Sequence, residues 1–212
     1  MVDLNALAEA ISAGDRKIAT GLTSDALTSG ISPGDILDAM TSAMSDVGGR
    51  FQRNEIYVPE MLIAARAMKE AMAVLEPVLV GAGIRPNATA ILGTVNGDLH
   101  DIGKNLVGMM WKGANIEVID LGTNVPAERF VQAAKEHNAR IVGISALLTT
   151  TMVGMRQVVD AIRAAGLANV EIIVGGAPLT AEFAREIGAD GYASDAGAAV
   201  DVVKAAIARQ AR

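Results

Sequence analysis

Residues 88–111 read ATAILGTVNGDLHDIGKNLVGMMW, an apolar run followed by a loop with glycines and then by an amphipathic segment. The apolar run predicts a buried strand over 88–95, and the spacing of apolar residues after the loop predicts a helix over 102–111. The same order of strand and helix recurs four more times toward the C-terminus. The further strands are expected at 116–121, 140–147, 170–176 and 190–194, and the further helices at 126–137, 152–165, 180–187 and 196–209. Such repeated units predict a parallel sheet with helices on both faces.

The residues before the first strand follow a different pattern. Apolar residues recur there every three or four positions, which predicts four short helices packed as an antiparallel bundle. The expected helices are 3–13, 15–29, 33–47 and 59–75, with Gly48 and Gly49 ending the third. Residues 81–87 have the composition of a linker. The expected fold class is therefore α/β, with a four-helix bundle over 1–83 and a Rossmann-like (flavodoxin-like) five-stranded parallel sheet domain over 84–212.

The composition excludes several classes of protein. Hydrophobic residues make up 51% of the 212 residues, which is enough for a core and excludes disorder. The sequence has no Cys, so it can form no disulfide, thiolate metal site or iron–sulfur cluster. A net charge of −6 argues against nucleic acid as a partner, no apolar run is long enough to span a membrane, and the N-terminus lacks the features of a signal peptide. We expect a cytoplasmic protein that binds neither nucleic acid nor membrane.

The loop after the first expected strand contains a candidate metal ligand. Ligands of parallel α/β sheets bind at the carboxyl ends of the strands, and His100 lies at such an end, two residues after Asp98. A neutral imidazole can bind a metal through one nitrogen while the other donates to a carboxylate. The residues alone leave open that Asp98 or Asp101 caps the next helix and that His100 is an exposed loop residue. One protein ligand cannot build a zinc site, so a metal bound by His100 would take its other ligands from a cofactor.

Small residues and hydroxyls follow two further expected strands. The third strand ends in SALLTTT, residues 145–151, and the fourth ends in Gly175 and Gly176. Glycines allow a bulky group to approach the backbone, and hydroxyls offer polar contacts in an apolar slot. The same residues are compatible with a turn and with a helix cap.

Taken together, Asp98-x-His100-x-x-Gly103, Ser145-x-Leu147 and Gly175-Gly176 resemble the vitamin B12-binding signature in order and spacing. The chain looks like the corrinoid-binding domain of cobalamin-dependent methionine synthase and of the small corrinoid proteins of methyltransferase systems. The first half resembles the helical cap domain of the same proteins in the segments VGGRF (47–51), YVPEM (57–61), ARAMK (65–69) and LEP (75–77). The resemblance covers nearly the whole chain.

The resemblance implies roles for individual residues. His100 is the implied lower ligand of cobalt, Asp98 is the implied partner of its other nitrogen, and Thr151 matches a serine that extends this relay in methionine synthase. Lys104 and Asn105 are expected to face the loop or solvent. The residues implied to contact the corrin ring or its nucleotide tail are Gly97, Leu99, Asp101, Gly103, Ser145, Leu147, Thr149, Gly175, Gly176 and Ala196. Those implied to cover the upper, methyl-bearing face are Phe51, Tyr57, Val58 and Met61.

The resemblance also implies a function. The implied cofactor is cobalamin in its methylcobalamin form, and the chain would be a methyl carrier with little or no activity alone. A substrate-specific methyltransferase would load the methyl group from a methylamine, methanol, betaine or aryl methyl ether, a second methyltransferase would remove it, and a reductive activator would restore the cofactor. Two alternatives remain, a B12-based sensor or regulatory module and the small subunit of a B12-dependent mutase. An α/β domain of response-regulator type would leave the joint spacing of the motifs unexplained.

Overall fold

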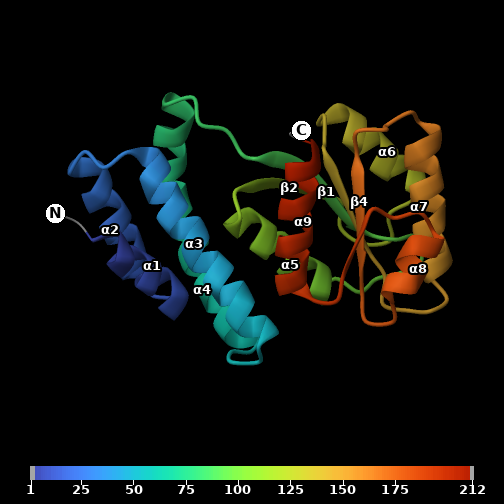
Figure 1. Ribbon diagram of the computed structural model, residues 1–212, viewed down its shortest axis with the longest axis horizontal. Helices are drawn as coiled ribbons and strands as arrows, with labels where there is room; N and C mark the ends of the chain where they lie inside the picture. Colours follow the sequence, from blue (N-terminus) through green and yellow to red (C-terminus); the bar gives the residue numbers. More distant parts are fainter. Residues whose placement is uncertain (1–2, 211–212) are drawn as a thin grey trace. The chain divides into compact units, whose positions relative to one another are not determined.

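The computed structural model describes residues 3–210. The chain divides into two compact units, one formed by the residues up to Pro86 together with Lys112–Asn115, and the other by Asn87–Trp111 and the residues from Ile116 onward. The first is helical and the second contains the sheet (Figure 1). We call them the helical unit and the sheet unit.

Within the described residues, the helical unit is built from α1 (Leu4–Ala13), α2 (Arg16–Thr28), α3 (Pro33–Gln52) and α4 (Val58–Gly81). The first three helices begin where a side chain caps the backbone. Asp3, Asp15 and Ser32 each accept a hydrogen bond from a backbone N–H of the first turn that follows. The apolar faces form an aliphatic and methionine core, whose largest buried side chains include Leu7, Ile11, Ile36, Met40, Met44, Met61 and Leu75.

Two helix ends expected from the sequence are wrong. The fourth helix does not end at residue 75 but continues through Pro77 to Gly81. Gly48 and Gly49 do not end α3, which continues to Gln52. A glycine inside a helix costs about 1 kcal/mol relative to alanine, and burial of the neighbouring Val47 offsets this cost. The left-handed residue after the helix is Asn54, with φ of 58°. No helix within residues 3–210 combines the length and the apolar character that crossing a bilayer requires.

The sheet unit alternates strands and helices as the sequence predicts. Its strands are β1 (Ala88–Thr94), β2 (Ile116–Asp120), β3 (Ile141–Ser145), β4 (Glu171–Gly175) and β5 (Gly191–Ala193). The helices are α5 (Ile102–Gly113), α6 (Ala127–Glu136), α7 (Met152–Ala164), α8 (Ala181–Glu186) and α9 (Ala196–Gln210). All strand pairs are parallel, and the strand order is β2-β1-β3-β4-β5. The expected flavodoxin-like five-stranded parallel sheet is therefore confirmed.

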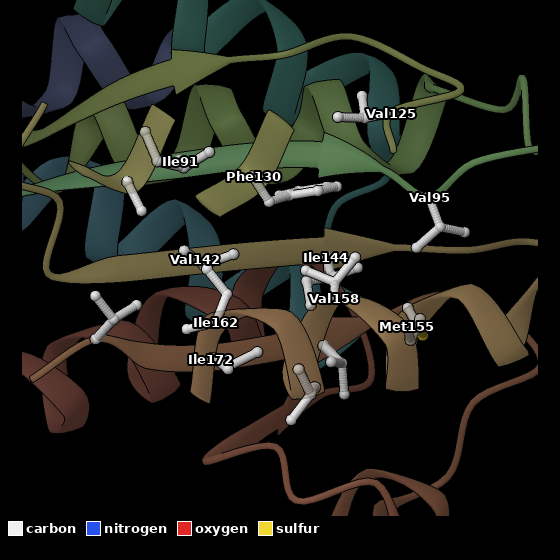
Figure 2. Close-up of a cluster of buried hydrophobic side chains, with 14 of the residues drawn as sticks. Ile91, Val95, Val125, Phe130, Val142, Ile144, Met155, Val158, Ile162 and Ile172 are labelled. Carbon is white, nitrogen blue, oxygen red and sulfur yellow. The ribbon is translucent and has the colours of Figure 1, made fainter. Parts of the chain in front are cut away.

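Helices cover both faces of this sheet. Figure 1 shows α5 and α9 on one face and α6, α7 and α8 on the other. The chain crosses the sheet in one direction from β1 to β2 and in the opposite direction afterwards, and right-handed crossovers then place α5 opposite to α6 and α7. The face under α6 and α7 holds a contiguous apolar cluster around Phe130, Ile144 and Val158 (Figure 2). On the other face, the buried Trp111 donates its indole N–H to the backbone oxygen of Ala199 at 2.9 Å.

The carboxyl ends of the strands lie in register at one edge of the sheet. Thr94 pairs with Ser145, Ser145 with Gly175, and Gly175 with Ala193. Between β1 and β3 the order of the strands reverses, because the chain leaves β1 for β2 on one side and continues from β3 on the other. In doubly wound sheets the loops that diverge at such a point leave a crevice in which ligands bind. The loops after β1 and β3 therefore flank the expected ligand position.

Candidate functional site

The loop between β1 and α5 is shaped by its own hydrogen bonds. The backbone N–H of Asp98 donates to the carbonyl oxygen of Val95 at 3.1 Å, and Gly97 inside this turn takes a left-handed φ of 81°. The backbone N–H of His100 donates to Asp98 Oδ1 at 3.0 Å, and the buried hydroxyl of Thr94 donates to the carbonyl oxygen of His100 at 2.9 Å. His100 is therefore held by its backbone on both sides.

Asp98 is a fully buried carboxylate that joins two loops. Its Oδ1 lies 2.9 Å from Nδ1 of His100. Its Oδ2 accepts hydrogen bonds from the loop after β3, namely from the backbone N–H groups of Leu147 at 2.8 Å and Leu148 at 3.3 Å and from the hydroxyl of Thr151 at 2.7 Å. The expected relay from Thr151 through Asp98 to His100 is thus present as a continuous chain of hydrogen bonds.

These contacts determine the charge on Asp98. Burial raises the pKa of the carboxyl group, but hydrogen bonds from Leu147, His100 and Thr151 outweigh it and hold the pKa well below its usual range. The ionised carboxylate can only accept hydrogen bonds, so Nδ1 of His100 must carry a proton. In the neutral ring the lone pair then lies on Nε2, and 51% of the imidazole side chain is exposed. The site therefore presents one oriented nitrogen ligand.

The surroundings of His100 fit a large apolar group with a metal at its centre. Leu99 is 73% exposed and Ile102 is 80% exposed, although both are large hydrophobic residues. Leu147 and Val153, in the loop after β3 and at the start of α7, are also exposed. Leu99 and Ile102 flank His100 in the sequence, and Leu147 donates its backbone N–H to Asp98, so exposed apolar residues lie beside the polar centre, as in a binding surface. A corrinoid would match this chemistry, because it is a large group whose cobalt could take a protein nitrogen such as Nε2 of His100 as a ligand.

The other residues expected at the strand ends are near the edge of the sheet. Ser145 is partly buried at the end of β3, Thr149 is exposed in the following loop, and Ala196 is buried at the start of α9. Gly176 has φ of 142°, and a Cβ there would lie 1.8 Å from the carbonyl oxygen of Ala146. This glycine therefore allows two backbone segments to pass each other. The contacts of these residues with a nucleotide tail stay predictions.

The four candidates from the first half of the chain all lie in the helical unit. Tyr57, with 65% exposure, and Val58 are exposed at the start of α4, and Phe51 is partly buried near the end of α3. Met61 is instead fully buried, because it shares the apolar stripe of α4 with residues such as Met68. Tyr57, Val58 and part of Phe51 therefore offer surface to a ligand, whereas Met61 belongs to the core of this unit.

Two polar residues near the loop have roles that the sequence analysis does not predict. Lys104 does not face solvent: it is buried, and its Nζ donates to Asp120 Oδ1 and to Asn105 Oδ1, each at 2.7 Å. Asn124, in the loop after β2, accepts the backbone N–H of Gly97 at 2.7 Å, and sequence reasoning misses this role. The acidic residue Asp120 at the end of β2 is the feature of the sequence from which a partner for Lys104 could have been predicted.

The fold and the site together define a class of protein. An oriented histidine beside exposed apolar residues at the switch point of a parallel sheet is typical of a domain that binds a cofactor. Family models described as B12 binding domains match residues 88–201, more than half of the chain, and residues 3–76. The chain therefore belongs to the family of B12-binding corrinoid proteins, and cobalamin or a related corrinoid is its cofactor.

Individual relatives agree with this family. Dimethylamine corrinoid protein 2 from Methanosarcina mazei is 42% identical to the chain over 81% of this chain and 82% of that protein. A solved cobalamin-binding protein from Desulfitobacterium hafniense DCB-2 matches with a TM-score of 0.82 and 33% identity, over 97% of this chain and 99% of that one. The methanol:cobalamin methyltransferase complex MtaBC from Methanosarcina barkeri matches with a TM-score of 0.85 and 28% identity, over 97% of this chain and 80% of that one.

Replacing Thr151 with valine tests the outer end of the hydrogen-bond chain. Valine keeps the branched shape but cannot donate to Asp98, so we expect the free energy of unfolding of the cofactor-free protein to fall by about 1 kcal/mol. Urea denaturation measures this change. Thr151→Ser, which keeps the hydroxyl, should behave as the unaltered protein. Equal stability of the valine variant and the unaltered protein would show that the bond contributes nothing.

Proposed function

We propose that this protein carries a methyl group on a bound corrinoid between two partner methyltransferases, and that Nε2 of His100 is its ligand to cobalt. The observation that carries the proposal is the hydrogen-bond chain from Thr151 through Asp98 to His100. The corrinoid supplies the chemistry, because its cobalt accepts and releases a methyl group. The names of the relatives, a dimethylamine corrinoid protein and a methanol:cobalamin methyltransferase complex, support methyl transfer.

In this function the chain's own residues bind the corrinoid and orient the histidine that would be its ligand. Asp98 holds the proton of His100 on Nδ1 and keeps the ring turned so that Nε2 points away from the carboxylate. Thr151 and the backbone of Leu147 hold the carboxylate itself in place. Exposed apolar residues such as Leu99 and Ile102 would lie against the corrinoid and exclude water.

Further residues are proposed to contact the corrinoid on the basis of the family. Gly97, Asp101 and Gly103 belong to the loop and helix start around His100, and a Cβ at Gly103 would meet no atom within 4 Å. Tyr57 and Val58 are assigned to the cofactor because they are exposed and because the helical unit matches a B12 binding model of its own. We also propose that the helical cap domain covers residues 1–83 and the cobalamin-binding domain residues 84–212.

The partners follow from the carrier function. One methyltransferase supplies the methyl group, a second removes it, and a reductive activator restores a cofactor that has been oxidised. The MtaBC complex supports a methyltransferase partner, since a chain similar to this one occurs there with a methyltransferase. The relatives' names favour the methyl carrier over a sensor or a mutase subunit. They also favour a methylamine or methanol as the source of the methyl group.

The axial ligand can be identified by electron paramagnetic resonance. The protein is labelled with 15N, loaded with unlabelled cobalamin and reduced to the cob(II)alamin state. Splitting of each cobalt line into doublets shows a protein nitrogen, whereas triplets show the cofactor's own base, because 15N and 14N differ in nuclear spin. Doublets are expected, and triplets alone contradict the assignment of His100.

Transfer is tested with the same loaded protein. Purified dimethylamine and methanol methyltransferases are each mixed with the reduced protein and their substrate, and formation of the methylated cofactor is followed by its absorption spectrum. Methylation with one of them supports the carrier function. A light-dependent change of oligomeric state with adenosylcobalamin, and no methylation, would favour the sensor instead.

A further inference from the structure

We infer that Asn124 is a positioning residue for the loop that carries His100. The inference rests on the proposed role of His100 as the cobalt ligand. Asn124 touches neither the imidazole nor Asp98's carboxylate in any described contact; it acts on the backbone of the loop from the side of β2.

Asn124 binds the loop at two consecutive residues. Its Oδ1 accepts the backbone N–H of Gly97 at 2.7 Å, and its own backbone N–H donates to the carbonyl oxygen of Asp98 at 2.9 Å. The neighbouring backbone continues this contact, because the N–H of Val125 donates to the carbonyl oxygen of Thr94 at 3.0 Å. The loop after β2 is therefore laid along the loop after β1 as a short extension of the sheet.

The backbone of Asn124 is adapted to this contact. Its φ is 53°, in the left-handed region that asparagine adopts more readily than most residues with a side chain. Gly97, its partner, also has a positive φ, of 81°. The two turns face each other, and the amide side chain of Asn124 joins them. A residue that tolerates this conformation but lacks an oxygen would leave the Gly97 N–H without its partner.

The two sides of the loop are held by different groups. The side chain of Asp98 is fastened to the loop after β3 through Leu147 and Thr151, whereas its backbone is fastened to the loop after β2 through Asn124. Without the Asn124 side chain, the turn at Gly97 can open while the carboxylate stays bound. The fraction of molecules with His100 in position then falls, and the apparent affinity for the corrinoid falls by the same factor.

Three variants separate the acceptor from the backbone conformation. Asn124→Gly keeps the left-handed φ and removes the acceptor, whereas Asn124→Asp keeps both. Asn138→Gly is the matched control, because Asn138 also has a left-handed φ, of 47°, but precedes β3 and so lies at the opposite, amino-terminal edge of the sheet. All three variants are made in the full chain.

The first measurement is amide hydrogen exchange of Gly97 in the cofactor-free protein. Asn124→Gly is expected to exchange faster by about tenfold, since the loss of one hydrogen bond lowers the cost of local opening. Asn124→Asp and Asn138→Gly should match the unaltered protein. Unchanged exchange in Asn124→Gly overturns the inference.

The second measurement is the binding of cobalamin to the 15N-labelled protein. The dissociation constant of Asn124→Gly is expected to rise, by less than the roughly tenfold change in exchange because part of the loop population stays closed. The share of doublet signal from the protein nitrogen should fall, and Asn124→Asp should restore both. If the unaltered protein gives doublets and Asn124→Gly gives the same affinity and signal, this inference alone is wrong. If the unaltered protein gives no doublets, the proposed ligand role of His100 is wrong and the inference falls with it.

Discussion

The variant His100→Ala is expected to lose the doublet signal of the protein nitrogen and to lower methyl transfer by more than about 100-fold. Loss of a hydrogen-bond partner of a metal ligand already costs about 10- to 100-fold, and here the ligand itself is removed. The cofactor-free variant should fold normally, because the imidazole is half-exposed and only one hydrogen bond of its ring is lost. Electron paramagnetic resonance and the transfer assay measure the two effects.

The sequence contains a matched control for this change. His137 is the only other histidine, and it lies at the end of α6, away from the carboxyl edge of the strands. His137→Ala should keep both the doublet signal and the rate of methyl transfer. A doublet signal that survives in His100→Ala would mean that another nitrogen of the protein is the ligand.

Asp98→Asn is expected to destabilise the cofactor-free protein by about 2–4 kcal/mol, the cost of losing charged hydrogen bonds in a buried site. All five contacts of the carboxylate come from groups that donate, so the NH₂ of asparagine must face at least one N–H or hydroxyl. If it faces His100, the ring accepts at Nδ1 and carries its proton on Nε2, which removes the lone pair that a metal needs. Urea denaturation and the doublet signal test the two consequences.

The pH dependence of this effect has a defined sign. The pKa of Asp98 is lower in the folded protein than its ordinary value of 3.8, so its contribution to stability is fully present above that value and is lost as the pH falls toward the folded pKa. The difference in unfolding free energy between Asp98→Asn and the unaltered protein should therefore shrink in acid. Asp15→Asn is the control, because asparagine caps a helix as well as aspartate and the change should cost less than about 0.5 kcal/mol at any pH. A loss of stability equal to that of the control would contradict the buried role of Asp98.

Much of this architecture can be predicted from sequence because its signals are local. Each strand is a short apolar run followed directly along the chain by a loop and a helix. The five strands can therefore be predicted from the local pattern. The Asp98–His100 pair is also local, since the two residues are two positions apart and share one turn. The contact of Thr151 with Asp98 spans 53 positions and was expected only through the resemblance to a known family.

The features that the sequence does not predict depend on contacts between residues far apart in the chain or on packing. A charged residue next to a loop is expected to be exposed. Lys104 of α5 is buried instead, because it forms an ion pair with Asp120 of β2, 16 positions away. The side chain of Asn124 accepts a hydrogen bond from the backbone N–H of Gly97, 27 positions away. Every residue except proline has such an N–H, so the sequence does not indicate this contact. At Gly48 the intrinsic preference of glycine predicts a helix end, but packing of the surrounding helix decides the outcome.

The hydrogen bonds around Asp98 join two loops that are about 50 residues apart in the sequence. Every described hydrogen bond that orients His100 joins one part of the polypeptide to another. The loops after β1 and β3 therefore set the direction of the imidazole together, so a substitution in the loop after β3 can turn the ring without touching it.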